Sequence, residues 1–116
     1  MLDWNEYLKQ VQGGVAAIAK TNPDIVKGYQ GLSSASGKTA LLGAKVNELI
    51  ALAVAVTVRC DGCIAVHTAA ARRAGATREE ILEALGTAIA VNAGAALVFS
   101  TRVMNALECG EPPQQR

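Results

Sequence analysis

Two cysteines and a histidine are the residues of this chain whose spacing best suits chemistry. Cys60 and Cys63 lie three residues apart in the segment RCDGCIAVH, and His67, the only histidine, follows Cys63 by four residues. Residues at these spacings share one face of a helix. The start of a helix stabilises a thiolate, which is the reactive form in peroxide reduction and in thiol–disulfide exchange. A disulfide within so short a ring constrains little of a fold. The segment therefore predicts a thiol pair that cycles between oxidised and reduced states.

Other interpretations of the same residues are open. The two cysteines could be unreactive buried thiols, and His67 could be a structural residue. A zinc site would need four ligands, which Cys60, Cys63, His67 and Cys109 could supply, although the sequence has no second CxxC or HxxxH pair. Covalent haem attachment needs a histidine directly after the second cysteine, where Ile64 stands. Cys109 belongs to a polar end segment, and we interpret it as incidental.

Glu48 is the acid that stands at the beginning of the apolar segment before the cysteines, twelve residues before Cys60. A histidine beside a thiol can accept its proton, and an acid can orient that histidine. An antiparallel hairpin about Cys60 would place His67 opposite Ala53, several ångströms from Glu48 at about 1.5 Å per residue. A contact between Glu48 and His67 therefore needs a steep crossing angle or a bridging water. Otherwise Glu48 is a charge favoured by the helix start.

The rest of the chain predicts an all-α fold of about six helices. Helix signals include Asp3 as an N-cap, Pro23 at a first helical position, Gly75 after a helix end, and a capping box between Thr77 and Glu80. The third helix is apolar almost all round and is expected to be central and buried. The segment NAGA is expected to form a turn before the last helix. The expected helices cover about 3–19, 23–36, 44–58, 60–74, 77–91 and 95–108.

Composition predicts one domain over 1–116, with a core over 44–108 and a polar tail over 109–116. Hydrophobic residues make up 51% of the 116 residues and aromatic residues only 3%, so small aliphatic side chains must fill the core. A single subunit built in this way should be only modestly stable, which favours a homo-oligomer. The net charge of +1, with no run of basic residues, argues against nucleic-acid binding. We expect no membrane association, because the apolar run over 49–58 is too short, and a cytoplasmic location, because no signal peptide is evident.

The set of Glu48, eleven residues, CDGC, three residues and His67 resembles the AhpD-like alkylhydroperoxidase branch of the carboxymuconolactone decarboxylase superfamily. The resemblance extends from about Lys45 to Val91, and weakly to Leu107. It implies an all-α fold that assembles into trimers or hexamers, and a peroxidase or disulfide-reductase activity without flavin or haem. Electrons would come from an external dithiol, such as a lipoylated or thioredoxin-like protein. The catalytic roles would fall to Glu48, Cys60, Cys63 and His67.

We therefore predict a cysteine-based peroxidase that reduces organic hydroperoxides and forms a Cys60–Cys63 disulfide. We assign Cys63 as the attacking thiol, because its base lies one turn away, and Cys60 as the resolving thiol, although the helix dipole favours Cys60. The rival enzyme class is a decarboxylase-type lyase, which would use acid–base groups and has no need of a dithiol. A disulfide reductase that serves another peroxidase is a further alternative. So is a non-enzymatic helical oligomer with inert or zinc-binding thiols.

Overall fold

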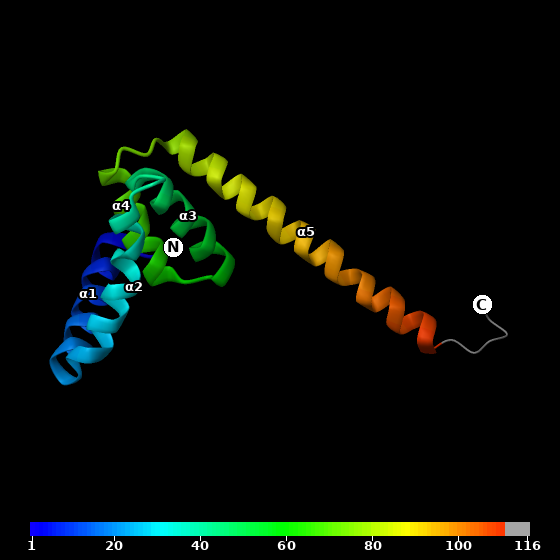
Figure 1. Cartoon of the computed structure of the whole chain (residues 1–116), viewed down its shortest axis with the longest axis horizontal. Coiled ribbons are helices and arrows are strands. Elements are labelled where there is room, and N and C mark those ends of the chain that lie inside the picture. Colours follow the sequence, from blue (N-terminus) through cyan, green and yellow to red (C-terminus); the bar gives the residue numbers. More distant parts are fainter. Residues whose placement is uncertain (111–116) are drawn as a thin grey trace.

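Five helices form almost all of the computed structural model, which describes residues 1–110 (Figure 1). No strand occurs within this range, so the predicted all-α class is confirmed. The last six residues of the predicted polar tail lie outside the described residues. The helices are α1 (Trp4–Thr21), α2 (Pro23–Thr39), α3 (Ala44–Val58), α4 (Asp61–Arg73) and α5 (Arg78–Gly110).

Local sequence signals determine where most of these helices begin and end. The Asp3 carboxylate accepts a hydrogen bond from the Glu6 N–H at 3.2 Å and caps α1. Gly75, with φ of +86°, follows the end of α4 in the left-handed conformation that glycine adopts easily. Before α5, the Thr77 N–H donates to the Glu80 carboxylate at 2.9 Å, and the Glu80 N–H donates to the Thr77 hydroxyl at 3.1 Å. The predicted capping box is therefore present.

The prediction of a sixth helix was wrong, because the turn expected at NAGA does not form. α5 runs through this segment without a break. A glycine such as Gly94 destabilises a helix by only about 1 kcal/mol relative to alanine, and no proline stops the helix there. The Asn92 amide also donates hydrogen bonds to the Ala88 carbonyl and to the Thr57 hydroxyl of α3, both at 2.8 Å. Asn92 thus joins two helices where a turn was predicted.

Two side-chain contacts show that α3 and α5 run in parallel. Lys45 Nζ lies 2.7 Å from a carboxylate oxygen of Glu80 near the start of both helices. Thr57 and Asn92 meet twelve residues further along each helix. α4 connects the two, and it packs against both α3 and α1, while α1 also packs against α2. In this order α4 returns the chain so that α5 can start beside the beginning of α3.

The core of a single copy is small. The buried side chains among the described residues are Leu52, Ala55, Ala65, Ala71 and Ala88. The radius of gyration is 20.1 Å, whereas a compact chain of this length would have about 13 Å. α3 is central, as predicted, but it is not buried throughout: Ile50, Val54 and Val58 are 48%, 55% and 62% exposed. The prediction failed because, among residues 1–110, no element fully covers that side of α3.

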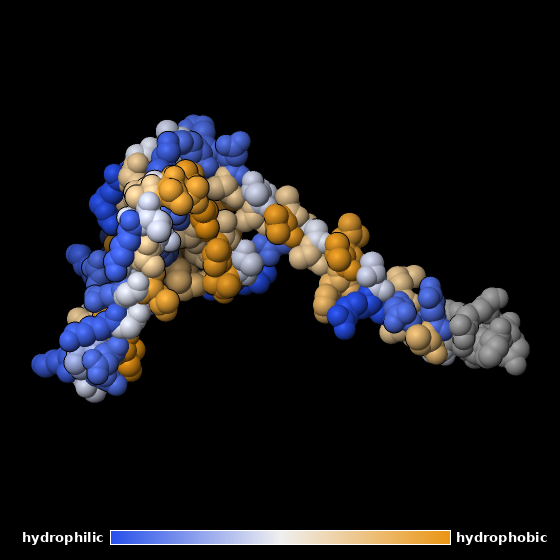
Figure 2. All heavy atoms as spheres, in the orientation of Figure 1, coloured by the Kyte–Doolittle hydropathy of each residue, from blue (hydrophilic) through white to orange (hydrophobic). Residues whose placement is uncertain are grey.

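α5 projects from the other helices as a long, largely exposed arm (Figure 1). Figure 2 shows apolar residues along α5 and on the part of the helical cluster that faces it. Among the described helices, α5 is the one that is long and apolar enough to cross a membrane, judged by length and composition alone. A helix that packs against other copies of the chain can be equally long and apolar. The absence of membrane association stays a prediction. The large apolar side chains exposed along the arm are Ile89, Val91, Leu97, Val98, Phe99, Val103, Met104 and Leu107.

The contact between Lys45 and Glu80 predicts a pH dependence of stability. The hydrogen bond from Lys45, and then the N–H of Thr77, lower the pKa of Glu80 from 4.5 to about 2. Because the pKa is lower in the folded chain, ionised Glu80 stabilises the fold above about pH 4.5. This stabilisation is lost as the pH falls towards 2. We expect Glu80→Gln to remove part of the decrease in melting temperature between pH 5 and pH 2. The effect should be modest, because the pair is exposed to solvent.

Glu79→Gln is the matched control, because Glu79 is the exposed neighbour of Glu80 and has no ion-pair partner among residues 1–110. Melting curves of the three proteins, recorded by circular dichroism over this pH range, provide the comparison. The same pH dependence in the wild type and in Glu80→Gln would contradict the assignment.

Candidate active site

A connection of two residues, Arg59 and Cys60, links α3 to α4. Arg59 has φ of +56°, the left-handed conformation, and ends α3. Cys60 is extended and is the N-cap of α4, where its Sγ accepts the Cys63 N–H at 3.1 Å. The prediction that the cysteine pair begins a helix is therefore confirmed. The capping group is the sulfur of Cys60, and Asp61 is the first helical residue.

Cys60 and Cys63 form a disulfide, with their Cα atoms 5.2 Å apart. Both residues are partly exposed. The N–H of Cys63 points at Cys60 Sγ, and the first turn of α4 supplies further N–H groups that have no partner within the helix. A negative charge on Cys60 Sγ would be stabilised by these groups. The geometry thus suits a sulfur that is released as a thiolate when the disulfide is reduced.

Glu48 and His67 meet directly across α3 and α4. His67 Nδ1 lies 2.7 Å from a carboxylate oxygen of Glu48, and each side chain is 26% exposed. The contact is direct and needs no bridging water. The two helices therefore do not pair as a simple antiparallel hairpin about Cys60 would, with His67 opposite Ala53. An ionised carboxylate can only accept, so Nδ1–H donates to Glu48. The other ring nitrogen, Nε2, is then left as an acceptor.

This polar pair lies on the face that α3 and α4 bury against each other. On α3, the buried Leu52 and Ala55 follow Glu48 at helical spacing. On α4, Ala71 follows His67 by one turn and is fully buried. Cys63 precedes His67 by one turn on the same side of α4. The packing of small apolar residues around the pair holds the imidazole in place beside the cysteine pair.

The zinc alternative requires Cys109 beside the other three residues. Cys109 instead lies near the far end of α5 and is exposed (Figure 1). Within residues 1–110, no three residues of the His, Cys, Asp and Glu types are arranged to hold a metal ion. The four ligands of the zinc alternative are therefore not brought together within residues 1–110.

α1 contributes to the surroundings of the cysteine pair, which the sequence motif did not indicate. A Cβ added to Gly62 would lie 3.7 Å from a methyl group of Val11, which is an ordinary contact distance. α1 therefore passes beside the CxxC turn. The space beside Gly62 would also admit the methyl group of an alanine. No pattern in residues 1–20 predicted which helix covers the turn.

Comparison with known proteins agrees with this arrangement. The sequence profile of the carboxymuconolactone decarboxylase family matches residues 23–106, which is most of the chain. The chain belongs to the carboxymuconolactone decarboxylase family. The match includes all four predicted site residues, and the resemblance noted from the motif is confirmed at the level of the family.

Relatives in this family cover almost the whole chain. An uncharacterized protein of Haemophilus influenzae is 45% identical, covering 90% of this chain and 92% of its own. A protein of Paracoccus denitrificans described as uncharacterized protein 4 in the cox locus is 30% identical, covering 87% and 91%. The crystal structure of an apo carboxymuconolactone decarboxylase family protein from Legionella pneumophila has a TM-score of 0.73 and 34% identity, covering 90% and 94%. These matches establish the family and the fold.

The position of the three cysteines predicts a simple thiol count. Oxidised protein should contain one thiol that reacts with a thiol reagent under denaturing conditions, that of Cys109, and fully reduced protein should contain three. Cys60→Ser and Cys63→Ser should each contain two thiols whether or not a mild oxidant is added. Mass spectrometry after alkylation provides the count. A disulfide that includes Cys109 in oxidised wild-type monomer would contradict the pairing.

Proposed function

We propose that this protein is a thiol peroxidase that reduces organic hydroperoxides through the Cys60–Cys63 disulfide. The observation that supports this most is the disulfide at the start of α4, with the Glu48–His67 pair one turn further along. Family membership supports an enzyme but does not name the reaction, because the relatives described above are uncharacterized.

The first step of the proposed cycle uses Cys63. His67 accepts the proton of the Cys63 thiol on Nε2, and Glu48 stabilises the resulting imidazolium through Nδ1–H. The thiolate attacks one oxygen of the hydroperoxide, and the O–O bond breaks. Cys63 becomes a sulfenic acid, and the departing alkoxide takes a proton from His67 to become an alcohol.

The second step uses Cys60. Its thiolate attacks the sulfur of the sulfenic acid, an S–S bond forms, and hydroxide leaves and is protonated to water. The N–H of Cys63 and the start of α4 favour the thiolate form of Cys60. An external dithiol, such as a lipoylated or thioredoxin-like protein, then supplies two electrons and returns both cysteines to thiols. Cys60 is also the better leaving sulfur in this exchange.

The competing functions differ in what they need. A decarboxylase-type lyase has no use for a redox-active dithiol. An inert helical module could use the Glu48–His67 pair to order its helices, but it has no use for a thiol pair at a helix start. A disulfide reductase would use the same four residues but would turn over a disulfide substrate faster than a hydroperoxide. Side-by-side turnover of both substrate types therefore separates the two redox activities.

We also propose that the protein works as a homo-oligomer, either a trimer or a hexamer. The exposed apolar residues on α3 and along α5 support this, because soluble monomers rarely expose such continuous apolar surface. The groove between α3 and α5 has a volume of about 310 Å³ and is lined mostly by apolar side chains, which suits a helix of another copy. Among residues 1–110, a lone subunit buries only five, so assembly would supply much of the stability.

Substitutions at the four site residues test the peroxidase proposal. With an organic hydroperoxide and a dithiol donor, Cys60→Ser and Cys63→Ser should each abolish turnover. Glu48→Gln and His67→Asn should lower kcat by about 10²- to 10⁴-fold, the usual contribution of general acid–base catalysis. Cys109→Ser is the control and should retain full activity. Full activity in both Cys60→Ser and Cys63→Ser would end the proposal.

Substitution of an exposed apolar residue on α5 tests the oligomer. We expect analytical ultracentrifugation of the wild type to give a multiple of the 12.0 kDa chain mass. Leu97→Asp, at a side chain that is 74% exposed in the single copy, should reduce the assembled fraction and lower the melting temperature. Asn105→Asp introduces the same charge at an exposed polar position of the same helix and should leave assembly intact. A wild type that sediments as a monomer would refute the proposal.

A further inference from the structure

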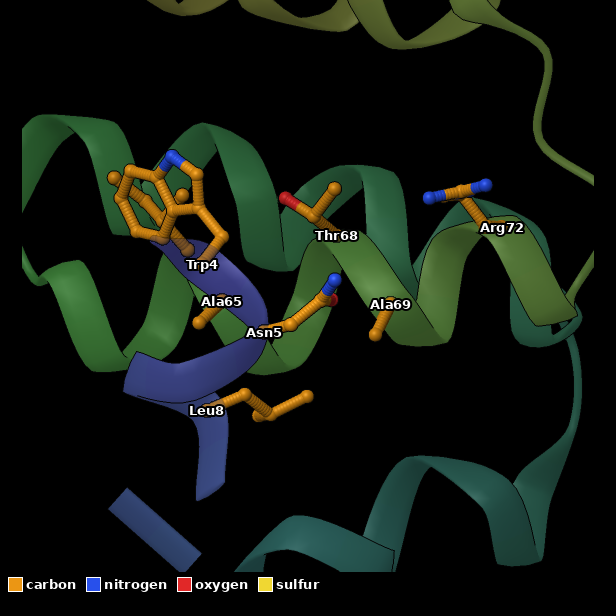
Figure 3. A pocket seen from close by; sticks show the side chains of 8 residues that line it. Trp4, Asn5, Leu8, Ala65, Thr68, Ala69 and Arg72 are labelled. Carbon is orange, nitrogen blue, oxygen red and sulfur yellow. The ribbon is translucent and has the colours of Figure 1, made fainter. Parts of the chain in front are cut away.

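A hollow of about 300 Å³ lies between the start of α1 and the outer side of α4. Figure 3 shows Trp4, Asn5 and Leu8 of α1 beside Ala65, Thr68, Ala69 and Arg72 of α4. Ile64 also lines the hollow. Most of this lining is apolar, and the polar groups are two neutral side chains and one guanidinium. A mostly apolar cavity with a few polar groups is typical of sites for small ligands.

Arg72 is the charged group of the hollow, and it stands at the opposite end from Trp4 (Figure 3). It forms no ion pair with any carboxylate in residues 1–110, where the two ion pairs are Lys45–Glu80 and His67–Glu48. Arg72 also lies in the last turn of α4, next to Arg73. A guanidinium without a carboxylate partner, at the edge of an apolar cavity, is suited to bind the carboxylate of an incoming molecule.

The hollow lies close to the cysteine pair. Ile64 lies one helical turn after Cys60, so the hollow reaches the first turn of α4, where the disulfide begins. α1 passes from the hollow to the CxxC turn, where Val11 faces Gly62. Arg72 lies eight residues after Ile64, about 12 Å along the helix. An elongated molecule held by Arg72 at one end would thus extend along α4 towards the disulfide.

From this arrangement we infer that the hollow between α1 and α4 binds amphipathic carboxylates, with the carboxylate on Arg72 and the hydrocarbon chain against Leu8, Ile64 and Ala65. The inference deepens the proposed function, and the part of it that concerns the substrate rests on that function. It names the substrate class as long-chain organic hydroperoxides that carry a carboxylate. The peroxide group would then reach the cysteine pair while the charged end stays at Arg72. An inert carboxylate of the same length would occupy the same site.

Fluorescence of Trp4 gives a direct test, because Trp4 is the only tryptophan of the chain and lines the hollow. Dodecanoate, added to the wild-type protein below its micelle concentration, should change this fluorescence in a saturable manner. Arg72→Gln should weaken dodecanoate binding about tenfold or more, because a charge-assisted hydrogen bond is lost. The same variant should leave the binding of uncharged dodecanol unchanged.

Arg73→Gln is the matched control, since it removes the same charge from the neighbouring position but does not line the hollow. It should leave dodecanoate affinity unchanged. Absence of a saturable signal in the wild type, or an equal loss of affinity in both arginine variants, would overturn the inference. An equal loss would mean that general surface charge attracts the carboxylate.

Kinetics separate this inference from the proposed function. Arg72→Gln should raise KM about tenfold for a long-chain carboxylate hydroperoxide, with kcat unchanged, and should leave both constants unchanged for cumene hydroperoxide. If no hydroperoxide is consumed but dodecanoate binds in an Arg72-dependent manner, the peroxidase proposal fails and the binding site stands. If both hydroperoxides are consumed and Arg72→Gln affects neither, the substrate assignment fails and the peroxidase proposal stands.

Discussion

The turn of two residues at Arg59 and Cys60 determines where the reactive groups of this protein lie. Arg59 adopts the left-handed conformation, which is unfavourable by roughly 1–2 kcal/mol for a residue that has a Cβ. The helices on either side must offset this cost. In return, α4 begins at once, and the N–H of Cys63 in its first turn donates to the sulfur of Cys60. Because α4 then runs back past α3, an imidazole from one helix meets a carboxylate from the other.

Polar contacts give the helices their register in a core that is mainly alanine. Alanine side chains allow close approach, but they bury little area and make few interlocking contacts, so they define relative helix positions weakly. Within residues 1–110, three side-chain contacts tie α3 to its neighbours: Lys45 with Glu80, Glu48 with His67, and Thr57 with Asn92. The first and third set α5 parallel to α3, and the second sets α4 against α3. The site pair thus also belongs to the framework that orders the helices.

What could be predicted from the sequence is mostly local. Caps at Asp3 and Thr77, the glycine after α4, and the CxxC pair at a helix start depend on residues within one turn of each other. The direct Glu48–His67 contact could not be derived, because it depends on how two helices cross rather than on spacing along either one. The continuity of α5 was missed because Asn92 looks like a turn residue until Thr57 is placed beside it. The cover that α1 gives the CxxC turn, and the exposed side of α3, depend on long-range packing and assembly that no motif encodes.

The unbroken α5 has a mechanical consequence. Its start is held by Glu80 against Lys45 and by Asn92 against Thr57, while the residues beyond Asn92 extend away from the cluster. The 18 residues of α5 beyond Asn92 are about 27 Å long. They act as a lever whose pivot is the contact between Asn92 and Thr57. A tilt of about 10° at the pivot would displace the far end by about 5 Å for this length. Lys45, which contacts Glu80 at the start of α5, lies three residues before Glu48. Small changes in the α3–α5 contact would therefore cause larger changes in the position of the far end of α5.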